Sequence, residues 1–412
     1  MKLLRRPPDR RLLPRGDRLP VRIRLSVLML LLYAIPGAIV PLFTLRLQEL
    51  GFPPLVMGLC CATQALGTML APVLAGQIAD RWIAAERCLA VCALVEAVLL
   101  WLLSSLTGPV EVFAVSLAFW LLMAPSYTLC TSICFASLAE QGRNYGQVRM
   151  WGTIGWVVPC WLLGIWLSDA QWLTLLRGHG ELRDAFRLAS MCALLFAGYV
   201  LTLPHTAPFK GGSLAAPLQA LRQLHGRAFW TYAFCTFGAC VCLPFSTQVT
   251  PLLLADLGIK QQYLLPTLTI AQASEVASLA LLPWALQRIG VRGAMRLGLV
   301  AAVLTMAGLM IGRPLVFSIG GLGLYGLCIS CYLVAGQVYL NWRTSVDVRA
   351  SAQALHSVLC GLGQLVGNVL VGFVRKEVNE AFAPTFAVAT VIAVVLFGVF
   401  LVGFPSHGQD PD

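Results

Sequence analysis

Long apolar stretches alternate with short polar segments along almost the whole chain. Each stretch is long enough for a helix to cross the hydrocarbon core of a bilayer, which takes about 20 residues. The runs are continuously apolar, which favours helices over the alternating strands of a membrane barrel. We predict an all-α membrane protein with twelve transmembrane helices, at residues 25–45, 55–79, 88–106, 112–138, 148–167, 186–203, 229–254, 263–286, 294–311, 315–340, 354–374 and 382–404.

The composition supports the same interpretation. Hydrophobic residues make up 58% of the 412 positions and charged residues only 11%, whereas soluble domains carry about 25% charged residues. A single soluble core stops growing beyond roughly 250–300 residues, so it could not bury this much apolar sequence. Polar residues kept inside the spans are costly there, and we expect function to reside in them.

Basic residues predict the orientation. Nine of the 29 Lys and Arg residues lie within the first 24 positions, and the positive-inside rule places this end in the cytoplasm. Alternating spans then put 21 of the 29 on the cytoplasmic side and both termini inside. The net charge of +11 is explained by this topology, so no nucleic-acid partner is expected. The apolar part of the first span is too long for a signal peptide, and we expect an uncleaved anchor.

The longest polar interval between spans divides the chain into two groups of six. Six plus six helices around a mid-membrane site is the layout of major facilitator transporters. We expect two six-helix halves related by pseudo-two-fold symmetry. The predicted parts are a basic cytoplasmic N-terminus (1–24), an N-terminal bundle (25–204), a central cytoplasmic loop (205–227), a C-terminal bundle (228–404) and a cytoplasmic tail (405–412).

The chemistry of an enzyme is not evident. Most of the fourteen cysteines lie inside spans, where they are expected to act as small packing residues rather than metal or redox ligands. No His/Asp or Cys/His constellation and no nucleophile with a base is apparent. We expect no enzyme activity, no metal and no cofactor.

A short motif lies between the second and third spans. Gly76, Asp80 and Arg81 form Gly-x-x-x-Asp-Arg, which resembles the opening of the major facilitator loop signature, although the usual trailing Gly-Arg-Arg is missing. An Asp near a helix end can engage charges or a dipole of the other half and latch one conformation. The alternative is an ordinary charged turn.

Five segments, the first of which contains this motif, carry a closer resemblance. They are GQIADRWIAAE (76–86), RMWGTIGW (149–156), LTLPH (201–205), AQASEVASLALLPWALQRIG (271–290) and RASAQ (349–353). Together they resemble the nucleoside:proton symporter family of the major facilitator superfamily, and RMWGTIGW and AQASE are the most specific. The resemblance implies a secondary active transporter that works by alternating access.

In the fifth predicted span, Arg149, Thr153 and Trp156 recur at i, i+4 and i+7, which places them on one helix face. The resemblance implies that this face lines the substrate cavity. Trp156 could stack on a planar ring, and Arg149 could donate hydrogen bonds to its acceptors. Alternatively, Arg149 anchors the cytoplasmic end of the span by snorkelling.

In the eighth predicted span, Gln272 and Glu275 share a face, and the resemblance implies that both face substrate. A carboxylate deep in an apolar helix is costly unless it is protonated, paired or hydrated. Glu275 is therefore the leading candidate for proton coupling, for substrate contact, or for both. The alternative is a buried hydrogen bond between helices.

Two other polar residues lack a counterpart in the family pattern. Glu96, near the middle of the third span, could be a second proton-coupling group, a partner for Arg149 or a local hydrogen-bonding residue. His356 could shuttle protons or simply pack and hydrogen-bond. The family's amides in span 7 and acid in span 10 are also missing, because those positions hold Leu243, Ser246 and Ser330.

The leading hypothesis is a proton-coupled nucleoside importer, with a nucleoside or similar polar ring compound, protons and the lipid bilayer as its partners. The alternatives are a proton symporter of a sugar or small aromatic acid and a non-transporting membrane sensor. We expect a monomer that spans the cell membrane, favouring a bacterial inner membrane.

Overall fold

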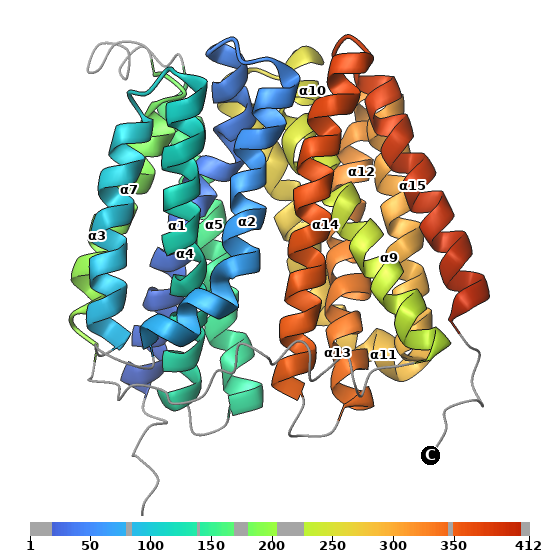
Figure 1. Ribbon diagram of the computed structural model, residues 1–412, viewed down its shortest axis with the longest axis horizontal. Coiled ribbons are helices and arrows are strands. Elements are labelled where there is room, and N and C mark those ends of the chain that lie inside the picture. Colours follow the sequence, from blue (N-terminus) through green and yellow to red (C-terminus); the bar gives the residue numbers. More distant parts are fainter. Residues whose placement is uncertain are drawn as a thin grey trace, which may run out of the picture.

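The computed structural model describes residues 19–79, 85–137, 141–168, 180–203, 226–344 and 349–404. Within these ranges every regular element is a helix. The first half of the chain forms one group, on the left in Figure 1. Its helices are α1 (Leu19–Glu49), α2 (Pro54–Ala79), α3 (Ala85–Leu103), α4 (Pro109–Ser137), α5 (Gln141–Trp166) and α7 (Asp184–Val200).

The second half forms a group on the right in Figure 1. Its elements are α9 (Arg227–Pro244), η1 (Phe245–Val249), α10 (Thr250–Asp256), α11 (Gln261–Ile311), α12 (Leu315–Cys328), η2 (Ile329–Val334), α13 (Ala335–Arg343), α14 (Arg349–Glu377) and α15 (Phe382–Gly403). The π-helical segments η1 and η2 each continue one helix into the next, so that 227–256 and 315–343 are two long helical runs.

The predicted apolar stretches fall on these helices. Eight helical runs among the described residues are long and apolar enough to cross a membrane, and the run Pro54–Leu70 is apolar but shorter. Some ends differ from the prediction, since α1 begins at Leu19 rather than residue 25 and α5 at Gln141 rather than 148. The helical hydrogen bonding continues into polar sequence there, which hydropathy does not detect. The chain is thus a multi-pass membrane protein.

Two irregularities have clear local causes. Pro244 ends α9 and is followed by the π-helical turn η1, because proline lacks the N–H that would continue the α-helical ladder. The predicted spans 263–286 and 294–311 both lie in α11, which is kinked at Gly290. The φ of Gly290 is 68°, in the left-handed region that glycine enters without steric cost.

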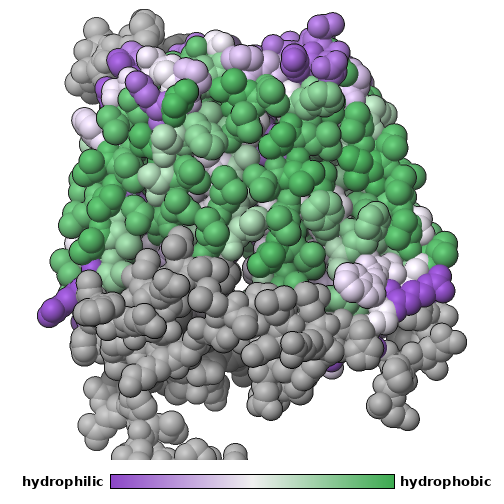
Figure 2. All heavy atoms as spheres, in the orientation of Figure 1, coloured by the Kyte–Doolittle hydropathy of each residue, from purple (hydrophilic) through white to green (hydrophobic). Residues whose placement is uncertain are grey.

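The surface suits a lipid environment. Hydrophobic side chains cover the middle of the face shown in Figure 2, while hydrophilic ones gather at its upper rim. Large apolar side chains are exposed on both groups, among them Trp101, Trp161, Trp230 and Trp284. Such a broad apolar surface is unfavourable in water and is covered by acyl chains in a bilayer.

The buried cores follow the same division. The largest hydrophobic cluster is built from residues 25–203 with Leu252 and Leu265 added, and three further clusters lie within residues 229–404. Helix α2 packs against α14 and α5 against α11. The first contact is very close: a Cβ added at Gly58 would lie 2.5 Å from the carbonyl oxygen of Asn368, and one at Gly372 would lie 2.7 Å from that of Pro54.

Candidate functional site

A cavity with about 520 Å³ of free volume lies between the two groups of helices, and we refer to it as the central cavity. Its walls come from α1 and α5 on one side and from η1, α10, α11 and α12 on the other. The lining residues are Val40, Pro41, Trp156, Cys160, Ser246, Thr247, Pro251, Leu268, Thr269, Ala271, Gln272, Leu322 and Tyr325. This position, inside the apolar belt and between the two groups, is where transporters bind substrate.

Two predicted site residues from distant parts of the chain line this cavity together. Trp156 comes from α5 and Gln272 from α11, and both side chains are half-buried. An indole plate and a carboxamide suit a planar ring with hydrogen-bonding groups on its edge. Hydroxyl groups add further polar contacts, from Ser246, Thr247, Thr269 and Tyr325.

Glycines allow α5 to lie close to α1, and this contact positions Trp156. A Cβ added at Gly37 of α1 would lie 2.6 Å from the carbonyl oxygen of Trp156. A Cβ at Gly155 would collide with the backbone of Leu30. Because no larger residue fits at either position, the backbone of α5 is held against α1 at the level of the cavity.

Arg149 lies two turns before Trp156 on α5, over an aromatic ring of α1. Its guanidinium carbon is 4.2 Å from the ring centroid of Tyr33, within the range of an attractive cation–π contact. The Tyr33 ring lies 5.0 Å from that of Tyr127 in α4. Gly152 leaves the space for this arrangement, since a Cβ there would be 2.8 Å from both Arg149 Nη1 and the Tyr33 ring.

Glu275 lies on α11, one turn after Gln272, and is half-buried. The positive charge of Arg149 acts on its carboxylate across the interface between the two groups. No ion pair joins these two side chains among the described residues. The helix is fixed here by α12: a Cβ at Gly326 would collide with the backbone nitrogen of Glu275, and the Gly326 N–H donates to Ser274 Oγ at 2.9 Å.

The other predicted residues are distributed as follows. Thr153 is half-buried on α5, and Arg149, Thr153 and Glu275 are not among the residues that line the central cavity. Gly76 is part of α2, whereas Asp80 and Arg81 of the loop motif lie outside the described residues. Ser330, at the position of the family's acid, is fully buried, donates to Cys331 Sγ and does not line the cavity.

Glu96 lies in the interior of the first group, in α3, with 0% of its surface exposed. Its Oε1 accepts a hydrogen bond from Ser126 Oγ of α4 at 3.2 Å, while its Oε2 has no hydrogen-bond partner in the structure. A buried carboxyl group with an unsatisfied oxygen is costly. A charged carboxylate at this position is therefore strongly disfavoured.

His356 is in a different situation. It is buried in α14, where the Tyr232 hydroxyl lies 2.7 Å from Nδ1 and Cys360 Sγ lies 3.5 Å from Nε2. Both ring nitrogens thus have partners inside the second group, which favours the packing role. Among the described residues, no group of three or more His, Cys, Asp or Glu side chains could hold a metal ion.

The sequence reasoning missed Tyr33 and Tyr325. Tyr325 lines the central cavity, and Tyr33 contacts Arg149. A tyrosine in the middle of an apolar stretch is a weak signal, because most such residues pack in a core. For Tyr33, the nearby Pro36 and Gly37 would have pointed to a close contact with another helix.

The site and the fold together define a membrane transporter. The family described as nucleoside H+ symporters matches residues 19–409 of the chain. In Escherichia coli (strain K12), the YegT protein is 28% identical over 92% of this chain and 93% of its own, and the xanthosine permease is 26% identical over 95% and 97%. The crystal structure of the nucleoside transporter NupG has a TM-score of 0.81 at 20% identity, covering 93% of this chain and 99% of that one.

The chain belongs to the nucleoside H+ symporter family. This confirms the family predicted from the sequence and, with it, the class of protein: a proton-coupled nucleoside transporter and not an enzyme. The likeness to NupG, at this level of identity, establishes the shared fold and does not transfer residue roles.

Proposed function

We propose that this protein imports a nucleoside together with protons by alternating access, and that the central cavity is its substrate site. The observation that carries the proposal is the meeting of Trp156 and Gln272 in one cavity between the two groups of helices. These residues are far apart in the sequence and belong to opposite groups, so a ligand held between them would sense the movement of one group against the other.

Each site residue has a role that follows from its chemistry. Trp156 stacks on the base and Gln272 hydrogen-bonds to polar groups of the substrate, both from the cavity wall. Thr153, one turn before Trp156 on the same helix face, hydrogen-bonds to the substrate at the edge of this site. Arg149 donates to substrate acceptors. Glu275 binds and releases the coupled proton; protonation removes its attraction for Arg149 and leaves the arginine to the substrate. Glu96 is the second candidate for proton coupling.

The proposal includes the arrangement in the membrane. Twelve spans form two six-helix halves with pseudo-two-fold symmetry, at 25–204 and 228–404, joined by a cytoplasmic loop at 205–227. The basic segment 1–24 and the tail 405–412 lie in the cytoplasm, and the protein works as a monomer in a bacterial inner membrane. Gly76, Asp80 and Arg81 form a latch between the halves. The distribution of Lys and Arg along the chain supports this orientation.

Substitution of Glu275 tests the coupling role. Protein reconstituted in liposomes is given labelled uridine with and without an inward proton gradient. We expect Glu275→Gln to lower gradient-driven uptake by about a hundredfold or more, because the amide cannot carry the proton. The matched control is Glu377→Gln, at an exposed position at the end of α14. Gradient-driven accumulation by Glu275→Gln at the wild-type level would remove Glu275 from the mechanism.

The lining of the central cavity favours an alternative function, a proton symporter whose substrate is a sugar or a small aromatic acid. Ser246, at a position where the family has an amide, contributes a hydroxyl to the cavity, and Thr247, Thr269 and Tyr325 contribute three more. Hydroxyl groups suit a polyhydroxylated ring. Competition of unlabelled nucleosides, sugars and aromatic acids against labelled uridine separates these substrates.

A further inference from the structure

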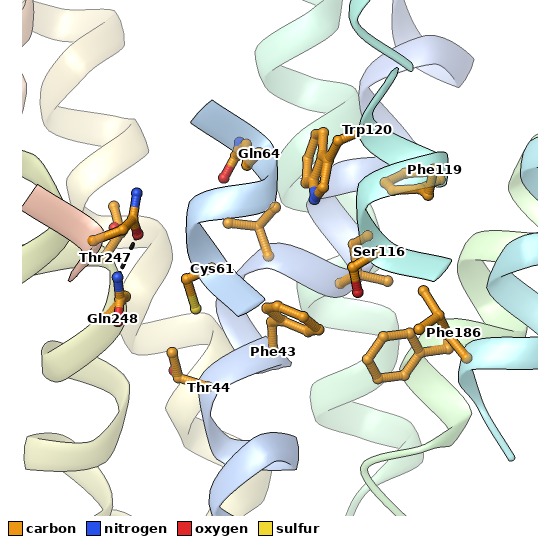
Figure 3. A pocket seen from close by; sticks show the side chains of 14 residues that line it. Phe43, Thr44, Cys61, Gln64, Ser116, Phe119, Trp120, Phe186, Thr247 and Gln248 are labelled. Carbon is orange, nitrogen blue, oxygen red and sulfur yellow. Dashed lines mark hydrogen bonds between the residues drawn. The ribbon is translucent and has the colours of Figure 1, made fainter. Parts of the chain in front are cut away.

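A second cavity adjoins the central one, and we refer to it as the upper cavity. Its residues from α1 lie toward the end of that helix, and its residues from α4 lie toward the start of that helix. The two cavities share Val40 and Thr247. Figure 3 shows Thr247 and Gln248 of the second group on one side of the upper cavity and Ser116 of the first group on the other. The polar lining is completed by the amides of Gln64 and Asn368.

Two hydroxyl groups of this cavity have no hydrogen-bond partner in the structure. Thr44 is 2% exposed and Ser116 is 1% exposed, and the hydroxyl oxygens of both lack a partner. A buried hydroxyl is strongly disfavoured without one. In a cavity that also presents amides, water provides the partner. We therefore expect the upper cavity to bind water.

The Glu96 oxygen without a partner, Oε2, lies where α3 packs against α4. Leu103 of α3 and Phe119 of α4 both line the upper cavity. Glu96 is seven residues before Leu103 on α3, and Ser126 is seven residues after Phe119 on α4. A separation of seven residues keeps the same helix face and spans about 10 Å. The Glu96–Ser126 hydrogen bond is thus two turns below the cavity, on the same face of each helix.

Among the described residues, no cation acts on Glu96. The titratable groups that interact with it are Cys92 on its own helix and Tyr127 and Cys130 on α4. From α7, the other main neighbour of α3, Ser190 donates its hydroxyl to the carbonyl oxygen of Ala97 at 2.7 Å. No ion pair in the part of the chain that the structure describes includes Glu96.

We propose that Glu96 is a proton-binding site of the first group, supplied by water in the upper cavity and separate from Glu275. Water reaching down the α3–α4 seam would give partners to Ser116 Oγ, Thr44 Oγ1 and Glu96 Oε2. A proton that binds Glu96 removes an unpaired charge from the interior. Tyr127 then links this site to the substrate side, because its ring packs on Tyr33, which holds Arg149. The proposal rests on the proposed proton-coupled function.

Infrared difference spectroscopy on the reconstituted protein tests the site without depending on the substrate. We expect a pH-dependent carboxyl band that exchanges in D₂O and is absent in Glu96→Gln. The role of water is tested by the double variant Thr44→Val/Ser116→Ala, which removes both cavity hydroxyls and keeps Glu96. We expect the Glu96 carboxyl band of this variant to exchange in D₂O about tenfold more slowly than in the wild type. The matched control is Ser104→Ala. Ser104 directly follows α3, and its buried hydroxyl donates to the carbonyl oxygen of Trp101 and does not line the cavity.

Transport and infrared measurements together distinguish a failure of the Glu96 proton site from a failure of proton-coupled nucleoside transport. Glu96→Gln should retain exchange of labelled for unlabelled uridine and lose gradient-driven accumulation by about tenfold or more. A carboxyl spectrum that is the same in the wild type and Glu96→Gln would overturn the proton site, whatever the transport result. Unchanged D₂O exchange in the double variant would overturn the water route. Failure of the wild type to accumulate uridine would instead contradict the proposed function and leave the spectroscopic result standing.

Discussion

At the scale of single residues, Arg149 interacts with both groups of helices. Its guanidinium lies over the Tyr33 ring, and its charge also acts on Glu275 of the opposite group. An aromatic ring attracts the charge of an arginine without using its N–H groups as a carboxylate would. These N–H donors therefore stay available for another partner. In the proposed mechanism, Tyr33 holds Arg149 in place while Glu275 or the substrate competes for the N–H groups of the arginine.

The substitution Gly152→Ala, which adds a single methyl group, tests this arrangement. In Gly152→Ala the new Cβ would lie 2.8 Å from both Arg149 Nη1 and the Tyr33 ring, so the arginine must move. We expect uridine affinity and uptake to fall about tenfold, which corresponds to roughly 1.4 kcal/mol. Measured uptake should be normal in the control Gly198→Ala, a helical glycine of α7 with no atom within 4 Å of an added Cβ. Equal activity of the two variants would contradict the role of Tyr33.

Only part of this site could be predicted from the sequence. The i, i+4, i+7 spacing identifies the shared face of Arg149, Thr153 and Trp156, and a buried carboxylate identifies Glu275. Spacing on one helix gives no information on its neighbour, so Tyr33 could not be matched to Arg149. That pairing depends on how closely α1 and α5 approach, which is set by Gly37, Gly152 and Gly155.

At the scale of helices, close contacts through glycine fix the elements that carry the site. Helix α12 meets α11 at Gly326, directly against the backbone of Ser274 and Glu275. In a membrane, small residues allow such close packing, which replaces the hydrophobic effect as the source of helix association. The position of Glu275 relative to the cavity therefore depends on Gly326.

Thermal unfolding of two α12 variants tests this dependence. Gly326→Ala should destabilise the protein by about 1–3 kcal/mol, because the methyl group forces the two helices apart. Gly320→Ala on the same helix has open space around its added Cβ and should be neutral, or stabilising by up to about 1 kcal/mol. Melting temperatures that rank the two variants in the opposite order would show that α12 does not fix α11 at this point.

The apolar pattern predicts where the helices lie and does not predict how they are interrupted. Each predicted stretch falls on a helix, because the hydrocarbon core leaves the backbone no other partner than itself. The π-helical segments after Pro244 and Cys328 and the kink at Gly290 leave the hydropathy unchanged. They result from backbone geometry and from packing against neighbouring helices, for which the linear pattern holds no signal.

At the scale of the whole molecule, the two groups of helices meet along α2 and α14 and along α5 and α11. The near-contact of Gly58 with Asn368, and of Gly372 with Pro54, brings the backbones of the two groups together at one end. Alternating access requires this contact to open and another to close around the substrate. The central cavity is lined in part by α5 and α11, so that its occupant can influence whether the contact between these two helices forms.

Uridine-driven proton entry is the measurement that tests the central claim most directly. Liposomes containing the protein and a trapped pH indicator are given external uridine in the absence of any starting gradient. A proton-coupled nucleoside transporter should acidify the lumen as uridine enters, and Glu275→Gln should admit no protons. Uridine entry by the wild-type protein without acidification of the lumen would contradict coupled transport, and with it the role given to the polar residues of the cavity.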